Sequence, residues 1–214
     1  MIILFGALSF ALTQGLRSSS TTGVQERAKL TASEILTYVE TLKTAVKSLR
    51  INGCADTSIS FYSTSWSDPT SYDNPDSPAA NADFSCHVFN PAGGATTFYN
   101  LPEGISGTSE YYITGGLAVT GLGTAVPELA VIAPDLSQEV CAEINKMLKV
   151  NSYAIDGYDA GFPFQGDYTA KAEVGDNGTN PTYVTGKTAA CMESTAFGGV
   201  PAGQYFFYYV LQAR

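Results

Sequence analysis

Residues 24–53, VQERAKLTASEILTYVETLKTAVKSLRING, carry one continuous apolar stripe at helical spacing. Successive members of the stripe lie four or three residues apart, which places them on one face of an α-helix. Charged residues fall on the other faces, and Asn52-Gly53 provides a stop because glycine readily adopts the left-handed conformation. The stretch therefore predicts an amphipathic helix over residues 24–52. The stripe consists of Ala28, Ala32, Ile35, Val39, Leu42, Val46 and Leu49.

Residues 1–16, MIILFGALSFALTQGL, contain no charge. As a helix they would span about 24 Å, slightly less than the roughly 30 Å hydrocarbon core of a bilayer. A helix that is apolar on all faces needs lipid or other copies of itself around it. Two alternatives are a buried core helix and a secretory signal peptide, although a signal peptide has a positive charge ahead of its apolar run.

Residues 17–23, RSSSTTG, separate these two stretches and are poor helix formers. Ser and Thr compete for backbone hydrogen bonds, and Gly loses more backbone entropy than other residues. We therefore expect a weak joint there. The chain divides into a stem of residues 1–53 and a disulfide-bonded, β-rich head of residues 54–214.

The composition and net charge of the chain argue against disorder and against nucleic-acid binding. Charged residues make up 14% of the 214-residue chain, against about 25% in an average soluble protein, which excludes charge-driven disorder. The net charge of −9 would repel the phosphates of a nucleic acid. The stem, residues 1–52, holds six Lys/Arg against three Glu, whereas residues 53–214 hold five against seventeen Asp/Glu. This asymmetry indicates two parts with different surroundings.

Motifs for catalysis or metal binding are weak. The single histidine, His87, adjoins Cys86 in a strand-like run, where neighbouring side chains point to opposite faces. The sequence has no phosphate-binding loop, dinucleotide fingerprint or GxSxG motif, so we expect no enzymatic activity and no cofactor. A weak candidate for a calcium site is formed by Asp156, Asp159 and Asp167, whose carboxylate oxygens could bind Ca²⁺. The candidate is weak because the spacing of these residues matches no EF-hand.

The head is predicted to consist mainly of strands. The run 128–134 is continuously apolar, which indicates a central strand, and 204–214 contains five consecutive aromatic residues, which indicates a strand buried on both faces or offering one face to a neighbour. The other predicted strands cover 57–63, two pieces of 86–104 and two glycine-broken pieces of 110–123.

One short helix and two loops complete the predicted head. Residues 135–138, DLSQ, form a plausible capping box that opens a helix ending at about residue 150. Residues 67–83 are dense in Asp, Pro, Ser and Asn and predict an acidic loop. Residues 151–203 are rich in Gly, Asp, Asn, Pro and Thr and are predicted to be mostly loop.

The apolar segment followed by the amphipathic helix resembles the N-terminus of the type IV pilin superfamily, which includes the pseudopilins of type II secretion. The resemblance covers residues 1–53 in detail and the head in architecture only. It implies an α+β fold in which a long N-terminal α-helix, apolar and then amphipathic, packs on an antiparallel β-sheet head. Family members usually have Glu at the fifth position of the mature chain, where Phe5 stands here, and the helix-breaking Pro is absent.

The resemblance also implies a function. The chain would be a structural subunit that polymerises through its apolar helix into an extracellular type IV pilus-like filament, for adhesion, motility or surface attachment. Its partners would be identical subunits, the inner membrane of a bacterium before assembly, and the pilus assembly machinery. A membrane-anchored adhesin or lectin-like head and a secretion-system pseudopilin are the alternatives. The residues expected in assembly are Ile2, Ile3, Leu4, Phe5, Leu8, Phe10, Leu12, Leu16, Arg17, Arg27 and Lys29.

Some of the three cations of that set are expected to pair with head carboxylates of neighbouring copies, because the stem and the head carry opposite net charge. The three are Arg17, Arg27 and Lys29.

The four cysteines predict two disulfides outside the cytoplasm, with four buried free thiols as the alternative. No pair is spaced like a metal-binding CxxC motif, and four cysteines allow three connectivities. In the family, cysteines commonly tie down the C-terminal part of the head. We expect Cys54–Cys86, joining the end of the stem to the segment after the acidic loop, and Cys141–Cys191, holding residues 151–203 against the short helix.

Overall fold

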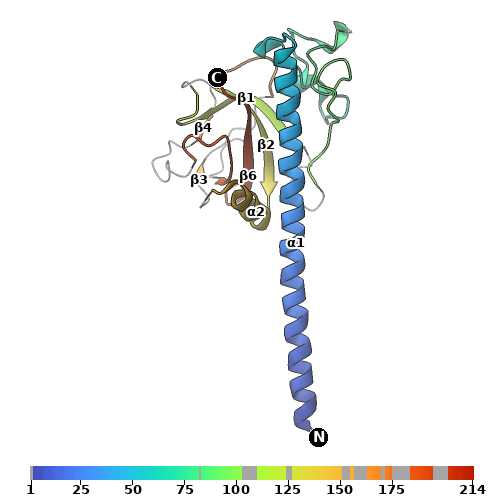
Figure 1. The fold of residues 1–214 in the computed structure, drawn as a ribbon, viewed down its shortest axis with the longest axis vertical. Helices are drawn as coiled ribbons and strands as arrows, with labels where there is room; N and C mark the ends of the chain where they lie inside the picture. Colours follow the sequence, from blue (N-terminus) through green and yellow to red (C-terminus); the bar gives the residue numbers. More distant parts are fainter. Residues whose placement is uncertain are drawn as a thin grey trace.

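The computed structural model describes residues 2–214 except 82, 103–109, 124–126, 151–154, 157–162, 170–171, 175–183 and 195–201, and it describes the side chains of the N-terminal helix from Gly23 onward. Within this part of the chain the fold is α+β. A long helix, α1 (Ile2–Ile51), lies along one face of a sheet, and a short helix, α2 (Gln138–Leu148), lies beside α1 at one end of that sheet (Figure 1). The N-terminal half of α1 extends well beyond the head.

The C-terminal half of α1 packs on the head through the predicted stripe. All seven stripe residues are at most 4% exposed, and they share one core cluster with the sheet, which confirms the amphipathic helix. The helix ends in a Schellman motif: the Cys54 amide donates to the Leu49 carbonyl and the Gly53 amide to that of Arg50, both at 3.1 Å. Gly53 has φ +96°, which only glycine adopts without strain.

The backbone of α1 is helical without a break across residues 17–23, so the weak joint expected there does not interrupt the helix of the isolated chain. Ser and Thr each cost only a few tenths of a kcal/mol relative to good helix formers. Such a cost is insufficient to break a helix that continues in both directions.

In the described part of the head, six strands form one sheet in the order β3-β5-β6-β2-β1-β4. The four central strands are antiparallel, and the short outer strands β3 and β4 pair in parallel with β5 and β1. Their bounds are β1 Tyr112–Val119, β2 Glu128–Leu136, β3 Ile155–Asp156, β4 Ala172–Val174, β5 Ala189–Ser194 and β6 Tyr205–Gln212.

The sheet is buried on both faces at its centre. Leu129 and Val131 of β2 face α1, whereas Ala130 and Ile132 face a second apolar cluster on the other side of the sheet. Strand β6 alternates in the same way. The central position of 128–134 and the two-sided burial of the aromatic C-terminal strand are therefore confirmed.

Helix α2 is present, but it begins later than the capping box predicted. Asp135 still belongs to β2, with φ +55°, and Ser137 is the N-cap, its hydroxyl accepting from the Val140 amide at 3.3 Å. The Asn145 side chain bonds both the amide and the carbonyl of Cys191 at 2.9 Å, taking the place of a neighbouring strand there. The disulfide Cys141–Cys191 joins α2 to β5 as expected.

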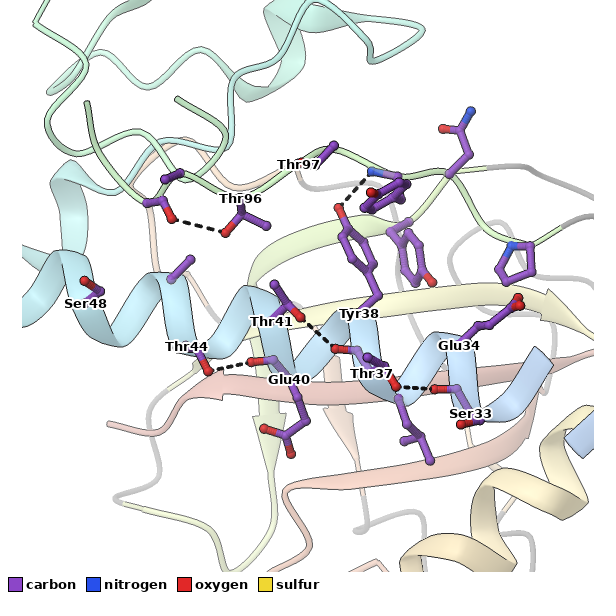
Figure 2. Close-up of a pocket in the computed structure, with 18 of the residues that line it drawn as sticks. Ser33, Glu34, Thr37, Tyr38, Glu40, Thr41, Thr44, Ser48, Thr96 and Thr97 are labelled. Atoms are coloured by element: carbon purple, nitrogen blue, oxygen red, sulfur yellow. Dashed lines mark hydrogen bonds between the residues drawn. The ribbon is translucent and has the colours of Figure 1, made fainter. Parts of the chain in front are cut away.

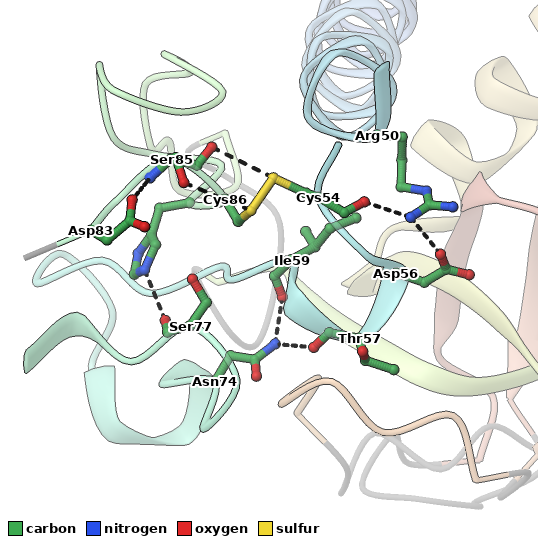
Figure 3. Close-up of a disulfide and its surroundings, with 11 residues drawn as sticks. Arg50, Cys54, Asp56, Thr57, Ile59, Asn74, Ser77, Asp83, Ser85 and Cys86 are labelled. Carbon is green, nitrogen blue, oxygen red and sulfur yellow. Dashed lines mark hydrogen bonds and ion pairs between the residues drawn. A yellow bond between two sulfur atoms is a disulfide. The ribbon is translucent and has the colours of Figure 1, made fainter. Parts of the chain in front are cut away.

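The strands predicted at 57–63 and within 86–104 are wrong. Residues 56–102 instead form turns and three short 3-10 helices, Asp56–Ser58, Pro69–Tyr72 and Ala79–Asn81, and the described part of this segment has only isolated bridges. The Asn74 amide donates to the carbonyls of Thr57 and Ile59, at 2.7 and 2.8 Å, so a side chain replaces strand pairing (Figure 3). The disulfide Cys54–Cys86 then ties this segment to the end of α1 as expected.

Two further differences lie in the sheet. The two glycine-broken pieces predicted over 110–123 form the single strand β1. The region 151–203, predicted as loop, contributes β3, β4 and β5. Strand β5 has the sequence AACMES, which contains no β-branched or aromatic residue, so its strand conformation depends on pairing with β6.

Candidate functional site

The residues predicted for assembly lie at the free end of the molecule. Positions 2–17 belong to the half of α1 that extends beyond the head, where α1 is a single rod with no other element beside it (Figure 1). The side chains of these positions lie outside the described residues. Arg27 and Lys29, at the start of the packed half, are exposed.

A groove runs along the outer face of the packed half of α1, which we call the α1 groove. Its wall opposite α1 is the segment 94–102 (Figure 2). Tyr111 also lines it. The groove has a volume of about 1390 Å³ and is open to solvent. Gly94 allows this close approach, because a Cβ there would lie 2.7 Å from the Val88 carbonyl oxygen and 3.2 Å from the Ala45 Cβ.

The α1 wall of the groove is a row of hydroxyl residues one helical turn apart. Thr37 Oγ1 donates to the Ser33 carbonyl at 2.7 Å, and Thr41 Oγ1 to the Thr37 carbonyl at 2.9 Å. Because the hydroxyl protons of Thr37, Thr41 and Thr44 bond the helix backbone, these threonines offer methyl groups and oxygen acceptors rather than donors. The members of the row are Ser33, Thr37, Thr41, Thr44 and Ser48 (Figure 2).

Three tyrosines cluster beside the middle of the α1 wall. Tyr38 lies edge-on to Tyr99 with ring centroids 5.6 Å apart and tilted against Tyr111 at 5.1 Å. The Tyr99 amide donates to the Tyr38 hydroxyl oxygen at 3.2 Å. Burial raises the pKa of Tyr38 to about 12, so its hydroxyl stays neutral at physiological pH. The side chain of Tyr99 is 60% exposed, and that of Leu30, which also lines the groove, is 65% exposed.

The charges of the groove are exclusively negative. Among the lining residues that the structure describes, only Glu34 and Glu40 carry a carboxylate, and none is a cation. Glu40 accepts a hydrogen bond of 2.5 Å from the Tyr209 hydroxyl, which also accepts from the Lys43 ammonium at 3.0 Å. Glu34 makes no hydrogen bond or ion pair within the described part of the chain.

The chemical candidates from the sequence do not converge on a site. His87 is buried, and its Nε2 lies 2.9 Å from the Ser77 carbonyl, while the adjacent Cys86 is held in a disulfide and offers no thiol. Asp167 is exposed and bonds the Thr169 hydroxyl at 2.8 Å. Asp159 and the side chain of Asp156 lie outside the described residues, so the calcium prediction is left as a prediction.

Two searches of the described residues found no further site. No group of three or more His, Cys, Asp and Glu among them could hold a metal ion. Of the helical stretches whose side chains are described, none is long and apolar enough to cross a membrane.

The α1 groove was not predicted from the sequence. The recurrence of Ser and Thr opposite the apolar stripe was visible as a pattern, but its other wall comes from residues some sixty positions away in the chain. Comparison with protein-family models, curated proteins and solved structures finds no match for this chain.

Proposed function

We propose that this protein is a structural subunit of an extracellular filament of the type IV pilus kind, and that it polymerises through the apolar N-terminal half of α1. One observation carries this proposal: the helix extends far beyond the head, while the first sixteen residues of its sequence contain no charge (Figure 1). A rod of this composition exposed to water would be a large apolar surface, which soluble monomers avoid.

The magnitude of the apolar effect supports assembly rather than a free rod. Burying about 1,000 Å² of such surface would contribute on the order of 25 kcal/mol before the entropy costs of association. The packed half of α1 supports the same reading, because it holds a rigid head at one end of the helix and leaves the other end available. The two disulfides agree with an oxidising, extracellular setting.

A second candidate is a membrane-anchored binding head that never polymerises. The α1 groove favours it, since a concave surface lined by tyrosines and hydroxyls suits a small ligand. Negative-stain microscopy of purified full-length protein separates the two candidates: helical fibres support the filament, and discrete particles support the anchored head.

The decisive variant is Leu8→Asp, which places a charge in the centre of the apolar segment. We expect it to abolish fibres while leaving the head folded, because an unpaired buried carboxylate is costly. The matched control is Leu8→Met, which retains apolar volume and should assemble normally. Circular dichroism and the non-reducing mobility of both variants check the head. Normal fibres from Leu8→Asp would show that the apolar segment is not at the filament axis.

A further inference from the structure

We propose that the α1 groove receives residues 17–23 of a second copy's α1, with Arg17 of that copy facing Glu34. The inference rests on the proposed filament function and adds to it a specific contact between copies. It concerns where neighbouring subunits meet outside the axial apolar packing.

The shape of the groove calls for an elongated occupant. Its α1 wall runs from Leu30 to Ser48, a separation of eighteen residues, which corresponds to about 27 Å along the helix. Leu30 and Tyr99 line it and are among the largest exposed apolar side chains in the described chain. A rod laid along the groove would cover both, which a compact ligand at one end would not.

The charges of the groove call for a cation. Of the described lining residues only Glu34 and Glu40 are charged, and Glu40 is already bonded by Tyr209. Glu34 is exposed and makes no ion pair with any residue that the structure describes. A partner that brings one positive charge to Glu34 therefore complements the groove.

Arg17 is the cation that most needs such a partner. It is the only charged residue among the first twenty-five, and positions 13, 14, 20 and 21, one helical turn away, are Thr, Gln, Ser and Thr. Once the apolar segment is packed among other copies, an unpaired guanidinium beside it would be costly. Its own helix supplies no carboxylate within a turn, so a neighbouring copy has to supply one.

The stretch around Arg17 also has the right size. Residues 18–23 are Ser, Ser, Ser, Thr, Thr and Gly, and small side chains allow two helices to approach closely. This stretch precedes Ala28, the first residue of α1 buried by its own head, so no head stands beside it (Figure 1). Arg27 and Lys29 are less suitable partners for Glu34. They lie only seven and five residues before it, so pairing either one with Glu34 of another copy would place the two heads side by side at nearly the same position along the helix axis.

The geometry fixes an offset between the copies. If the two α1 helices are parallel and Arg17 of one copy lies level with Glu34 of the other, the first copy is shifted along the helix axis by seventeen residues, or about 26 Å, relative to the second. The same shift places Ser20 of one copy level with Thr37 of the other.

Cysteine cross-linking in fibres tests this contact. Full-length chain carrying Ser20→Cys and Thr37→Cys is assembled and then mildly oxidised, and we expect a ladder of multimers on a non-reducing gel. The control carries Ser20→Cys and Lys47→Cys, since Lys47 is exposed on α1 outside the groove, and it should give no ladder. Fibres without a ladder, or with equal ladders in both variants, would overturn the inference. An absence of fibres from the unsubstituted chain would instead remove the filament function itself.

Charge reversal provides an independent measurement. Glu34→Arg should raise the critical concentration for assembly about tenfold, or about 1.4 kcal/mol per subunit, and adding Arg17→Glu should restore it. The control Glu26→Arg changes an exposed glutamate of α1 outside the groove and should have little effect. Thermal unfolding checks that each head is intact. Equal effects of Glu34→Arg and Glu26→Arg, or no rescue by the double change, would contradict the pairing.

Labelling in assembled fibres distinguishes other occupants. A single Thr37→Cys should react with a soluble maleimide in the unassembled chain and be protected in fibres. Full reactivity in fibres would mean that the groove faces solvent there and serves a different ligand, and the inference would then be wrong.

Discussion

At the level of single residues, His87 is the buried histidine of the loop segment, residues 56–102. Its Nε2 lies 2.9 Å from the Ser77 carbonyl, which can only accept, so Nε2 carries the proton and donates. Burial lowers the pKa of His87, although Asp73 and Asp83 act in the opposite direction. The folded protein therefore holds this imidazole neutral.

This predicts a loss of stability on acidification. As the pH falls below about 6.5, the unfolded chain takes up a proton at His87 that the folded chain resists, so the free energy of unfolding decreases. We expect the melting temperature to fall more between pH 7.5 and 5.5 in the wild type than in His87→Gln, which keeps a donor for Ser77. Parallel pH profiles for the two proteins would show that His87 does not carry this effect.

At the level of elements, the two faces of α1 contribute unequally to the stability of the head: the stripe face is buried, and the groove face is exposed. Leu42 is fully buried in the stripe, whereas Thr41, its neighbour in sequence, is exposed in the α1 groove. Leu42→Ala should therefore destabilise the head by about 2–5 kcal/mol, and Thr41→Ala by less than about 0.5 kcal/mol. Urea unfolding of both variants measures the difference. Similar losses would mean that the groove face is itself part of the folded core.

The loop segment 56–102 depends on its connection to α1. Cys54–Cys86 closes a loop with a sequence separation of 32, and Arg50 pairs with Asp56 at 2.6 Å just beyond the helix end (Figure 3). Replacing both cysteines by Ala should lower the free energy of unfolding by about 3–4 kcal/mol on the loop-entropy estimate. Removing Cys141–Cys191 in the same way gives the comparison. No measurable loss for the first pair would show that the aromatic packing of the segment holds it without the disulfide.

At the scale of the whole molecule, charge and apolar area contribute differently to assembly. The stem is positive and the head strongly negative, but exposed ion pairs contribute only about 0–1 kcal/mol each and are screened within about 8 Å at physiological salt. The apolar segment offers far more. Charges between copies should therefore set register, and apolar packing should set strength.

A salt series on assembled fibres tests this ranking. We expect fibres to persist in about 1 M NaCl without detergent, because high salt screens ion pairs but does not weaken apolar burial. Sedimentation followed by microscopy measures the remaining fibre. Dissociation by salt alone would reverse the ranking.

The elements that could be predicted are those whose signal lies within one stretch of sequence. The stripe from Ala28 to Leu49 has a helical period that leaves one face to bury, and β2 and β6 are apolar enough to require burial on both sides. These properties belong to consecutive residues, so they need no knowledge of the rest of the fold.

The segment 56–102, strand β5 and the α1 groove could not be predicted in this way, because they depend on tertiary contacts. The segment 57–63 alternates like a strand, yet its backbone partners come from elsewhere in the chain: the Asn74 side chain and the backbone of Cys86 and Val88. Strand β5 forms because β6 pairs with it, and the groove exists because residues 94–102 return to lie along α1. Each of these features depends on partners that are distant in sequence, and the pattern of a single stretch cannot contain them.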